Sequence, residues 1–255
     1  MSKSQKDRVI AIIPARYASQ RLPAKPLADI AGKPMVQHVY ERTARATLVH
    51  TVLVATDDER IASAVRSFGG HAVITPESCQ NGTDRIAFVT KSLKDADIVI
   101  NVQGDEPLIE PAMIDEAVRP LLDDRNTHMG TLVRRIESEA DLVNPNIVKV
   151  VLDRDGRCLY FSRSAIPFGR DRAQHDWLQH HTYYKHIGLY VFRRDLLLRY
   201  AEMHQTPLER MEKLEQLRIL EHGFPIKAVV TLHDSITVDT TDDLERVRAL
   251  ILKTS

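Results

Sequence analysis

The sequence predicts an α/β fold in which a mostly parallel sheet carries helices on both faces. In the first half of the 255-residue chain, short apolar runs alternate with segments whose apolar residues recur at helical spacing. The short runs are apolar at every position, which is typical of parallel strands that are buried on both faces. Strands and helices that alternate in this way indicate a sheet covered by helices on its two sides.

The first half supplies the regular part of this pattern. Strands are expected at 9–13, 52–55, 72–74 and 98–102, and helices at 36–44, 61–68 and 86–93. The helix at 61–68 ends at a pair of glycines, Gly69 and Gly70. Because ligands of open α/β sheets bind outside the carboxyl ends of the strands, we expect the functional site at that edge.

The second half is less regular. Strands are expected at 130–133, 147–152, 158–161, 187–192 and 226–231, and the polar stretch 167–182 is predicted to be a loop or lid. Residues 206–209 form a capping box that opens a helix to about Glu221, and a closing helix is expected at 244–252. On the helix that begins at 206–209, Leu208, Met211, Leu214 and Leu217 recur at helical spacing and are predicted to face the core.

The composition narrows the class of protein. The chain balances 35 Lys and Arg against 35 Asp and Glu, whereas nucleic-acid-binding proteins usually carry a basic excess. A hydrophobic content of 43% suffices to bury a core. The two cysteines, Cys79 and Cys158, are too few for a disulfide framework, and no apolar run approaches the roughly 20 residues of a membrane span. We therefore expect a single cytoplasmic domain that binds neither nucleic acid nor membrane.

The loop after the first strand carries the first chemical signal. The chain contains neither the GxGxxG fingerprint of dinucleotide-binding folds nor a P-loop, although its first strand–loop–helix unit is clear. The loop at 14–27 instead holds three cations, Arg16, Arg21 and Lys25. Cations in such a loop can neutralise a polyphosphate, since Arg gives bidentate contacts and Lys a point charge. A solvated basic loop is the alternative.

Two acidic residues are candidate metal ligands. Asp105 follows the strand at 98–102, and a carboxylate at the carboxyl end of a strand suits Mg²⁺. Gly104, beside it, lets the backbone come close to a ligand. Asp239 precedes the closing helix and is the second candidate. The alternatives are a polar turn for Asp105 and a helix cap for Asp239.

A third segment lies at the start of the helix that includes 86–93. Gly82, Thr83 and Arg85 combine a flexible backbone, a hydroxyl and a cation at a helix N-terminus, which suits contacts with a base or a phosphate. An ordinary helix cap formed by Thr83 is the alternative.

Segments along the whole chain resemble one family, in order. IIPARYASQRLPAKPL at 12–27 resembles the signature loop of sugar-activating cytidylyltransferases. NVQGDEP at 101–107 resembles the metal-binding motif of one branch, the 3-deoxy-manno-octulosonate (Kdo) cytidylyltransferases. Further matches are NPNIVKVV at 144–151, LYFSRSAIP at 159–167, YKHIGLY at 184–190, KLEQLR at 213–218, and DT with DLERV within 239–247. The resemblance covers roughly residues 9–250.

The resemblance implies a Rossmann-like nucleotide-diphospho-sugar transferase fold with a mixed, mostly parallel sheet. It implies Mg²⁺ as cofactor, a homodimer, and CTP and Kdo as substrates that give CMP-Kdo and diphosphate for lipopolysaccharide biosynthesis. A related sugar acid such as 8-amino-Kdo is the alternative substrate. Residues of about 9–130 and 226–252 would form the nucleotide and metal core. Residues of about 131–225 would form the sugar-acid and dimer subregion.

The family's functional positions carry over to this sequence residue by residue. The resemblance implies catalytic roles for Arg21, Lys25, Asp105 and Asp239, the last two as Mg²⁺ ligands. It implies CTP contacts for Ala15, Arg16, Arg21, Lys25, Gly82, Thr83, Arg85 and Gln103. It implies sugar-acid contacts for Arg163, His186, Glu215 and Gln216, and Glu212 is expected to share the helix face of Glu215 and Gln216. Two departures bear on the backbone, since Ala24 and Thr237 stand where the family commonly has Gly.

Overall fold

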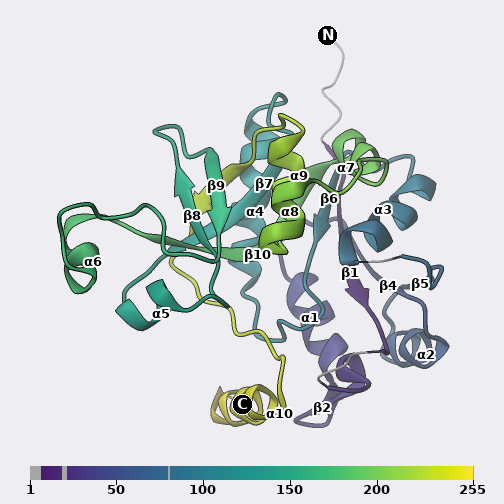
Figure 1. Ribbon diagram of the computed structural model, residues 1–255. Coiled ribbons are helices and arrows are strands. Elements are labelled where there is room, and N and C mark those ends of the chain that lie inside the picture. The colour runs from purple at the N-terminus through teal and green to yellow at the C-terminus, as the bar shows by residue number, and fades with distance from the viewer. Residues whose placement is uncertain (1–6, 19–21, 80, 255) are drawn as a thin grey trace.

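A nine-stranded sheet forms the centre of the computed structural model, which describes residues 7–18, 22–79 and 81–254 (Figure 1). Its strands are β1 (Val9–Ala15), β4 (Thr51–Thr56), β5 (Ala72–Ile74), β6 (Ile98–Asn101), β7 (Met129–Arg135), β8 (Lys149–Leu152), β9 (Cys158–Ser162), β10 (Tyr184–Arg193) and β11 (Lys227–Val230). The main path runs β11-β7-β10-β6-β1-β4-β5, and β8 and β9 extend it from β10. A separate small hairpin pairs β2 (Asp29–Ile30) with β3 (Lys33–Pro34).

The sheet is mixed but mostly parallel, as the sequence predicts. β1 pairs in parallel with both β4 and β6, and β4 with β5. β10 runs antiparallel to β6 and β7, and β11 is again parallel to β7. The predicted strands are confirmed, with bounds that differ by a few residues. The division into a nucleotide core and a sugar-acid subregion stays a prediction, and the sheet runs through both parts.

Helices cover both faces of the sheet (Figure 1). They are α1 (Met35–Thr43), α2 (Glu59–Ser67), α3 (Gly82–Ser92), α4 (Pro111–Asp123), α5 (Glu139–Val143), α6 (Trp177–His180), α7 (Arg194–Tyr200), α8 (Pro207–Glu212), α9 (Gln216–Glu221) and α10 (Thr241–Thr254). One core cluster packs α1, α2 and α4 on the side of Val9, Ala11 and Ile13. The other packs α3, α7 and α9 on the side of Ile10 and Ile12, so that successive residues of β1 enter opposite cores.

The single helix predicted from 206 to about 221 is wrong. Lys213 adopts a left-handed conformation (φ 57°) and divides the segment into α8 and α9. The helical spacing therefore does not persist across the break, and Met211 is 83% exposed whereas Leu214 and Leu217 are buried. Leu208 is also exposed. The predicted helix start is confirmed: Thr206 precedes α8, and its N–H donates a hydrogen bond of 3.3 Å to Glu209 Oε2, one of the two bonds of a capping box.

The predicted loop at 167–182 contains more structure than its polar composition indicates. A short 3₁₀ turn (Gln174–Asp176) leads into α6, whose Trp177 is buried between the rings of Phe168 and Tyr183. These aromatic contacts order a stretch that has no apolar period of its own. Among the described residues, no helix has the length and the apolar character needed to cross a bilayer.

A buried ion pair fastens α8 to α9. Both nitrogens of the Arg218 guanidinium fork bind Glu209, with Nη2–Oε1 at 2.6 Å and Nε–Oε2 at 2.8 Å. The two side chains are only 10% and 5% exposed. The hydrogen bonds to Glu209 raise the pKa of Arg218, so the guanidinium stays charged.

We expect Glu209→Gln to lower the free energy of unfolding by about 2–4 kcal/mol, because it leaves a buried cation without its counter-charge. Urea unfolding monitored by circular dichroism measures this loss. Glu245→Gln is the matched control, since Glu245 pairs with Arg248 but is 61% exposed, and its expected cost is below about 0.5 kcal/mol. Equal costs for the two variants would contradict the assignment.

Candidate active site

Three charged side chains converge beyond the carboxyl ends of β1 and β6. The Lys25 ammonium lies 2.7 Å from Asp105 Oδ2 and 3.2 Å from Asp239 Oδ1. It also donates a hydrogen bond of 2.9 Å to the carbonyl oxygen of Val238. The three charged side chains are between 15% and 34% exposed, so the cluster is sheltered but reachable from solvent. Residues 80 and more positions apart in the sequence thus meet at the edge where the sequence predicts the site.

The loop after β1 brings Lys25 to this point through a strained backbone. Ala24 has φ 55° and ψ 27°, a left-handed conformation that glycine adopts more readily. The geometry agrees with the resemblance, which has Gly commonly at this position. Lys25 then opens a 3₁₀ turn (Lys25–Leu27) whose N–H bonds tie it to the preceding loop.

Gly104 allows a close approach between two parts of the protein. A Cβ atom on Gly104 would lie 2.6 Å from the carbonyl oxygen of Pro14, which no side chain tolerates. The sequence interpretation was that this glycine accommodates a ligand. In the structure its bare backbone lets the turn after β6 pack against the end of β1, and this packing places Asp105 beside the loop that carries Lys25.

Asp239 does not cap the closing helix. Thr240 does so: its Oγ1 accepts a hydrogen bond of 3.2 Å from the N–H of Asp243, and Asp243 Oδ2 accepts one of 2.9 Å from the N–H of Thr240. The Asp239 carboxylate is therefore directed to Lys25 instead. The cap alternative for Thr83 is wrong as well, because Asn81 caps α3 by accepting a hydrogen bond from the N–H of Asp84.

The residues implied to contact CTP lie mostly at the same edge of the sheet. Ala15 ends β1, and Arg16 follows it, half-buried. Gly82 begins α3, where an added Cβ would lie 3.1 Å from the Pro14 ring. Thr83 is buried and accepts a hydrogen bond from Asn101 at the end of β6. Gln103 donates a hydrogen bond of 2.9 Å to the Gly188 carbonyl on β10.

One arginine of that set, Arg85, lies elsewhere. Arg85 is completely buried, and its guanidinium donates to Asp57 Oδ2 at 2.6 Å and to the Thr75 hydroxyl. In this conformation Arg85 links α3 to the residues that follow β4 and β5, and its side chain is not accessible to a ligand. Arg21 lies outside the described residues, so its predicted catalytic role stays a prediction.

Three of the residues implied to contact the sugar acid adjoin this region. Glu215, at the start of α9, accepts a hydrogen bond from Thr83, which links the two predicted substrate regions. Burial raises the pKa of Glu215 to about 7, although that hydrogen bond acts in the opposite direction. The buried amide oxygen of Gln216 accepts a hydrogen bond of 3.1 Å from the Tyr190 hydroxyl. His186 shares a hydrogen bond of 2.9 Å with the hydroxyl of Thr131.

Arg163 and Glu212 form a separate pair. The N–H of Arg163 donates to Glu212 Oε2 at 3.0 Å, and its Nε donates to the Glu212 carbonyl at 2.8 Å. The Ser162 hydroxyl donates to the other carboxylate oxygen at 2.6 Å. Because Lys213 breaks the helix, Glu212 does not share one helix face with Glu215 and Gln216, and that expectation is wrong.

The buried imidazole of His186 predicts a pH effect on stability. Burial lowers the pKa of His186 to about 3, well below the usual 6.5. Between these values the unfolded chain binds a proton that the folded protein excludes, so stability falls as the pH decreases through this window. We expect His186→Gln to flatten the dependence of the unfolding free energy on pH between 4 and 6. The exposed His181, changed to Gln, should leave the slope unaltered, and an unchanged slope in both variants would refute the assignment.

The cluster suits a divalent cation. Two carboxylates already enclose one cationic group, the Lys25 ammonium, which shows that a positive charge is stable between them. Mg²⁺ typically binds one or two carboxylates together with substrate phosphates rather than a complete protein cage. The described part of the chain contains no group of three or more His, Cys, Asp and Glu residues arranged to hold a metal.

Sequence reasoning did not find some of the groups at this site. The Val238 carbonyl binds Lys25, and no residue type marks a backbone acceptor. Glu106 is 4% exposed and accepts a hydrogen bond of 2.5 Å from the Ser235 hydroxyl. Burial raises the pKa of Glu106 to about 7. The position of Glu106 beside Asp105, within the NVQGDEP segment, was the available signal.

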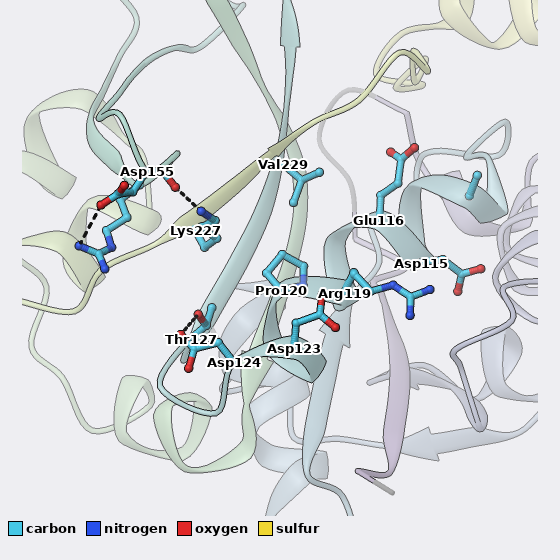
Figure 2. A pocket seen from close by; sticks show the side chains of 12 residues that line it. Asp115, Glu116, Arg119, Pro120, Asp123, Asp124, Thr127, Asp155, Lys227 and Val229 are labelled. Atoms are coloured by element: carbon cyan, nitrogen blue, oxygen red, sulfur yellow. Dashed lines mark hydrogen bonds and ion pairs between the residues drawn. The ribbon is translucent and has the colours of Figure 1, made fainter.

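A pocket of about 680 Å³ lies elsewhere, between α4 and β11 (Figure 2). Asp124 and Thr127, which line it, precede β7, so it extends toward the amino-terminal ends of the strands. Lys227 donates across it to the Asp155 carbonyl (Figure 2). None of the predicted site residues lines this pocket. It is therefore distinct from the cluster around Asp105.

Comparisons with known proteins identify the family of this chain. The family model described as "Cytidylyltransferase" matches residues 10–235. The 3-deoxy-manno-octulosonate cytidylyltransferase of Geobacter metallireducens is 58% identical over 247 residues, which cover 94% of this chain and 96% of the relative. That of Syntrophus aciditrophicus is 50% identical over 248 residues, or 96% and 98% of the two chains.

Solved structures similar to this chain belong to cytidylyltransferases as well. CMP:2-keto-3-deoxy-manno-octonic acid synthetase complexed with CTP superposes with a TM-score of 0.92 at 42% identity, and covers 98% of this chain and 100% of that one. The 4-diphosphocytidyl-2C-methyl-D-erythritol synthase of Anaerococcus prevotii shares the fold alone, with a TM-score of 0.64 at 13% identity over 97% and 100% of the chains. This chain is a member of the cytidylyltransferase family, in the branch of the 3-deoxy-manno-octulosonate cytidylyltransferases.

Proposed function

We propose that this protein activates Kdo by converting CTP and 3-deoxy-D-manno-octulosonate to CMP-Kdo and diphosphate, as a step toward lipopolysaccharide. The observation that carries the proposal is the convergence of Lys25, Asp105 and Asp239 outside the carboxyl ends of β1 and β6. The relatives at 50–58% identity bear the name of this activity. The structure at 42% identity holds CTP on the same fold.

The reaction requires positioning and charge neutralisation more than covalent chemistry by the protein. The anomeric hydroxyl of the sugar acid attacks the α-phosphorus of CTP, and diphosphate leaves. The leaving group gains negative charge, which Lys25 and, in our proposal, Arg16 and Arg21 stabilise. Asp105 and Asp239 would hold Mg²⁺, which when bound supplies positive charge at the phosphates and increases the acidity of a coordinated hydroxyl.

Two of the groups on the sugar side, His186 and Gln216, are neutral. With a pKa of about 3, His186 is uncharged near neutral pH and can contact a sugar hydroxyl only as a neutral imidazole. The Gln216 amide nitrogen is buried without a hydrogen-bond partner, which suits a polar ligand group that reaches it. The hydrogen bond from Thr83 to Glu215 places a residue implied to contact CTP beside one implied to contact the sugar acid.

A panel of sugar acids tests the substrate. The protein is incubated with CTP and Mg²⁺ and with either Kdo, 8-amino-Kdo or a nonulosonic acid, and the nucleotide-sugar product is identified by mass spectrometry. We expect CMP-Kdo as the main product. A clear preference for another acid would retain the nucleotidyl-transfer chemistry and reject Kdo as the substrate.

We also propose that the active form is a cytoplasmic homodimer. The free thiols of Cys79 and Cys158 suit a reducing compartment. Exposed apolar side chains, such as Phe168 at 76% exposure and Leu159 at 59%, are available for burial between subunits. Light scattering should give about twice the chain mass of 29.0 kDa, and a monomer at working concentrations would refute the dimer.

A further inference from the structure

Residues 231–240, called here the strap, connect β11 to α10 and carry Asp239 near their end. The strap contains no helix or strand (Figure 1). The separation between Asp105, which follows β6, and Asp239 is therefore not fixed by a regular hydrogen-bonded element. It depends on the individual contacts that tie the strap to the sheet.

These contacts are concentrated on the residues beside the acidic pair. The Ser235 hydroxyl donates to Glu106 Oε2 at 2.5 Å, and the N–H of Val238 donates to the Asp105 carbonyl at 2.9 Å. Farther back, Asp234 pairs with Lys185 at 3.1 Å and with Arg134. The strap is thus joined directly to the two consecutive residues 105 and 106.

The contact between Ser235 and Glu106 is harder to break than the ion pairs of Asp234. Glu106 is 4% exposed, so release of Ser235 would leave a buried carboxyl oxygen without its hydrogen-bond donor. Asp234, in contrast, has a side chain that is 47% exposed and can exchange its partners for water. The carboxyl of Glu106 therefore anchors the strap one residue from Asp105 and four residues before Asp239.

We propose that Ser235 and Glu106 are positioning residues, which hold the Asp105 and Asp239 carboxylates at the separation that a divalent cation requires. Neither side chain needs to touch substrate or metal. The proposal rests on the proposed function, because it presumes that the two aspartates bind Mg²⁺ together with CTP. It predicts that loss of the tie weakens metal binding more than it weakens the fold.

The affinity of the CTP complex for Mn²⁺, measured by electron paramagnetic resonance, tests this directly. We expect Ser235→Ala to weaken Mn²⁺ binding about fivefold or more, with a smaller effect on the affinity for CTP. Ser235→Thr, which keeps the hydroxyl, and Glu106→Gln, which keeps an acceptor oxygen, should each retain most of the wild-type affinity. Ser92→Ala is the matched control, since the Ser92 hydroxyl donates a hydrogen bond of 2.8 Å to the Val89 carbonyl within its own helix, α3.

The outcomes separate this proposal from the proposed function. Wild-type Mn²⁺ affinity in a folded Ser235→Ala variant would overturn the positioning role, as would a loss of thermal stability with unchanged metal affinity. If Asp105→Asn leaves Mn²⁺ binding intact, the metal site is elsewhere and this proposal fails with it. Diphosphate release by the wild-type protein reports independently on the proposed function.

Discussion

Replacement of Asp105 by Asn should lower turnover of CTP and Kdo by about 10³-fold or more, while the protein stays folded. The side chain is 26% exposed and contacts the Lys25 ammonium. Loss of its charge removes half of the proposed metal-binding pair. A bound divalent ion stabilises the transition state by several kcal/mol, and each factor of ten in rate corresponds to about 1.4 kcal/mol. The backbone carbonyl of Asp105, which accepts the N–H of Val238, is unaffected by the substitution.

Steady-state diphosphate release measures the effect, and urea unfolding checks the fold. We expect a change in stability below about 1 kcal/mol, because partly exposed ion pairs contribute little. Asp155→Asn is the matched control: it makes the same chemical change at an exposed carboxylate beside the pocket between α4 and β11. Turnover close to that of the wild type in folded Asp105→Asn protein would eliminate Asp105 as a metal ligand.

Replacement of Lys25 by Met should lower turnover by about 10²–10³-fold, the usual cost of losing one donor that stabilises developing charge. The Lys25 ammonium lies between the two aspartates. From there its positive charge can stabilise the phosphates of a bound nucleotide. The same variant should bind Mn²⁺ at least as tightly as the wild type without nucleotide, because the ammonium no longer competes for the carboxylates.

Lys33→Met separates a local effect from a general loss of charge. Lys33 pairs with Glu41 at 2.8 Å, on the hairpin and helix that follow the loop, and its removal should leave turnover nearly unchanged. Weaker Mn²⁺ binding in nucleotide-free Lys25→Met than in the wild type would show that Lys25 supports the metal site instead of competing with it. Equal losses of turnover in the two lysine variants would remove Lys25 from the catalytic machinery.

The sheet and the position of the site are the parts that the sequence predicts well. Runs such as those of β1 and β6 are apolar at every position, and only a strand covered on both faces uses such a run fully. Parallel order then places the residues after each strand at one edge. This rule alone predicts that Asp105 and the loop that carries Lys25 lie close together, without knowledge of any side-chain contact.

The remaining features depend on contacts between distant segments. Helical spacing at 208–217 gives no sign that Lys213 turns left-handed, because the break is stabilised by the packing of α8 against α9 through Glu209 and Arg218. Arginine is a residue type that commonly binds phosphate, but hydrogen bonds to Asp57 and Thr75 hold the Arg85 side chain inside the protein. Asp239 resembles a helix cap until the structure shows that Thr240 fills this role.

The measurement that tests the central claim most directly is the release of diphosphate from CTP and Kdo. The purified protein is assayed with Mg²⁺ and with the metal removed by a chelator, and CMP-Kdo is quantified in the same samples. We predict one diphosphate for each CMP-Kdo, dependent on both Kdo and Mg²⁺. Absence of diphosphate release by folded protein with both substrates and Mg²⁺ would contradict the account.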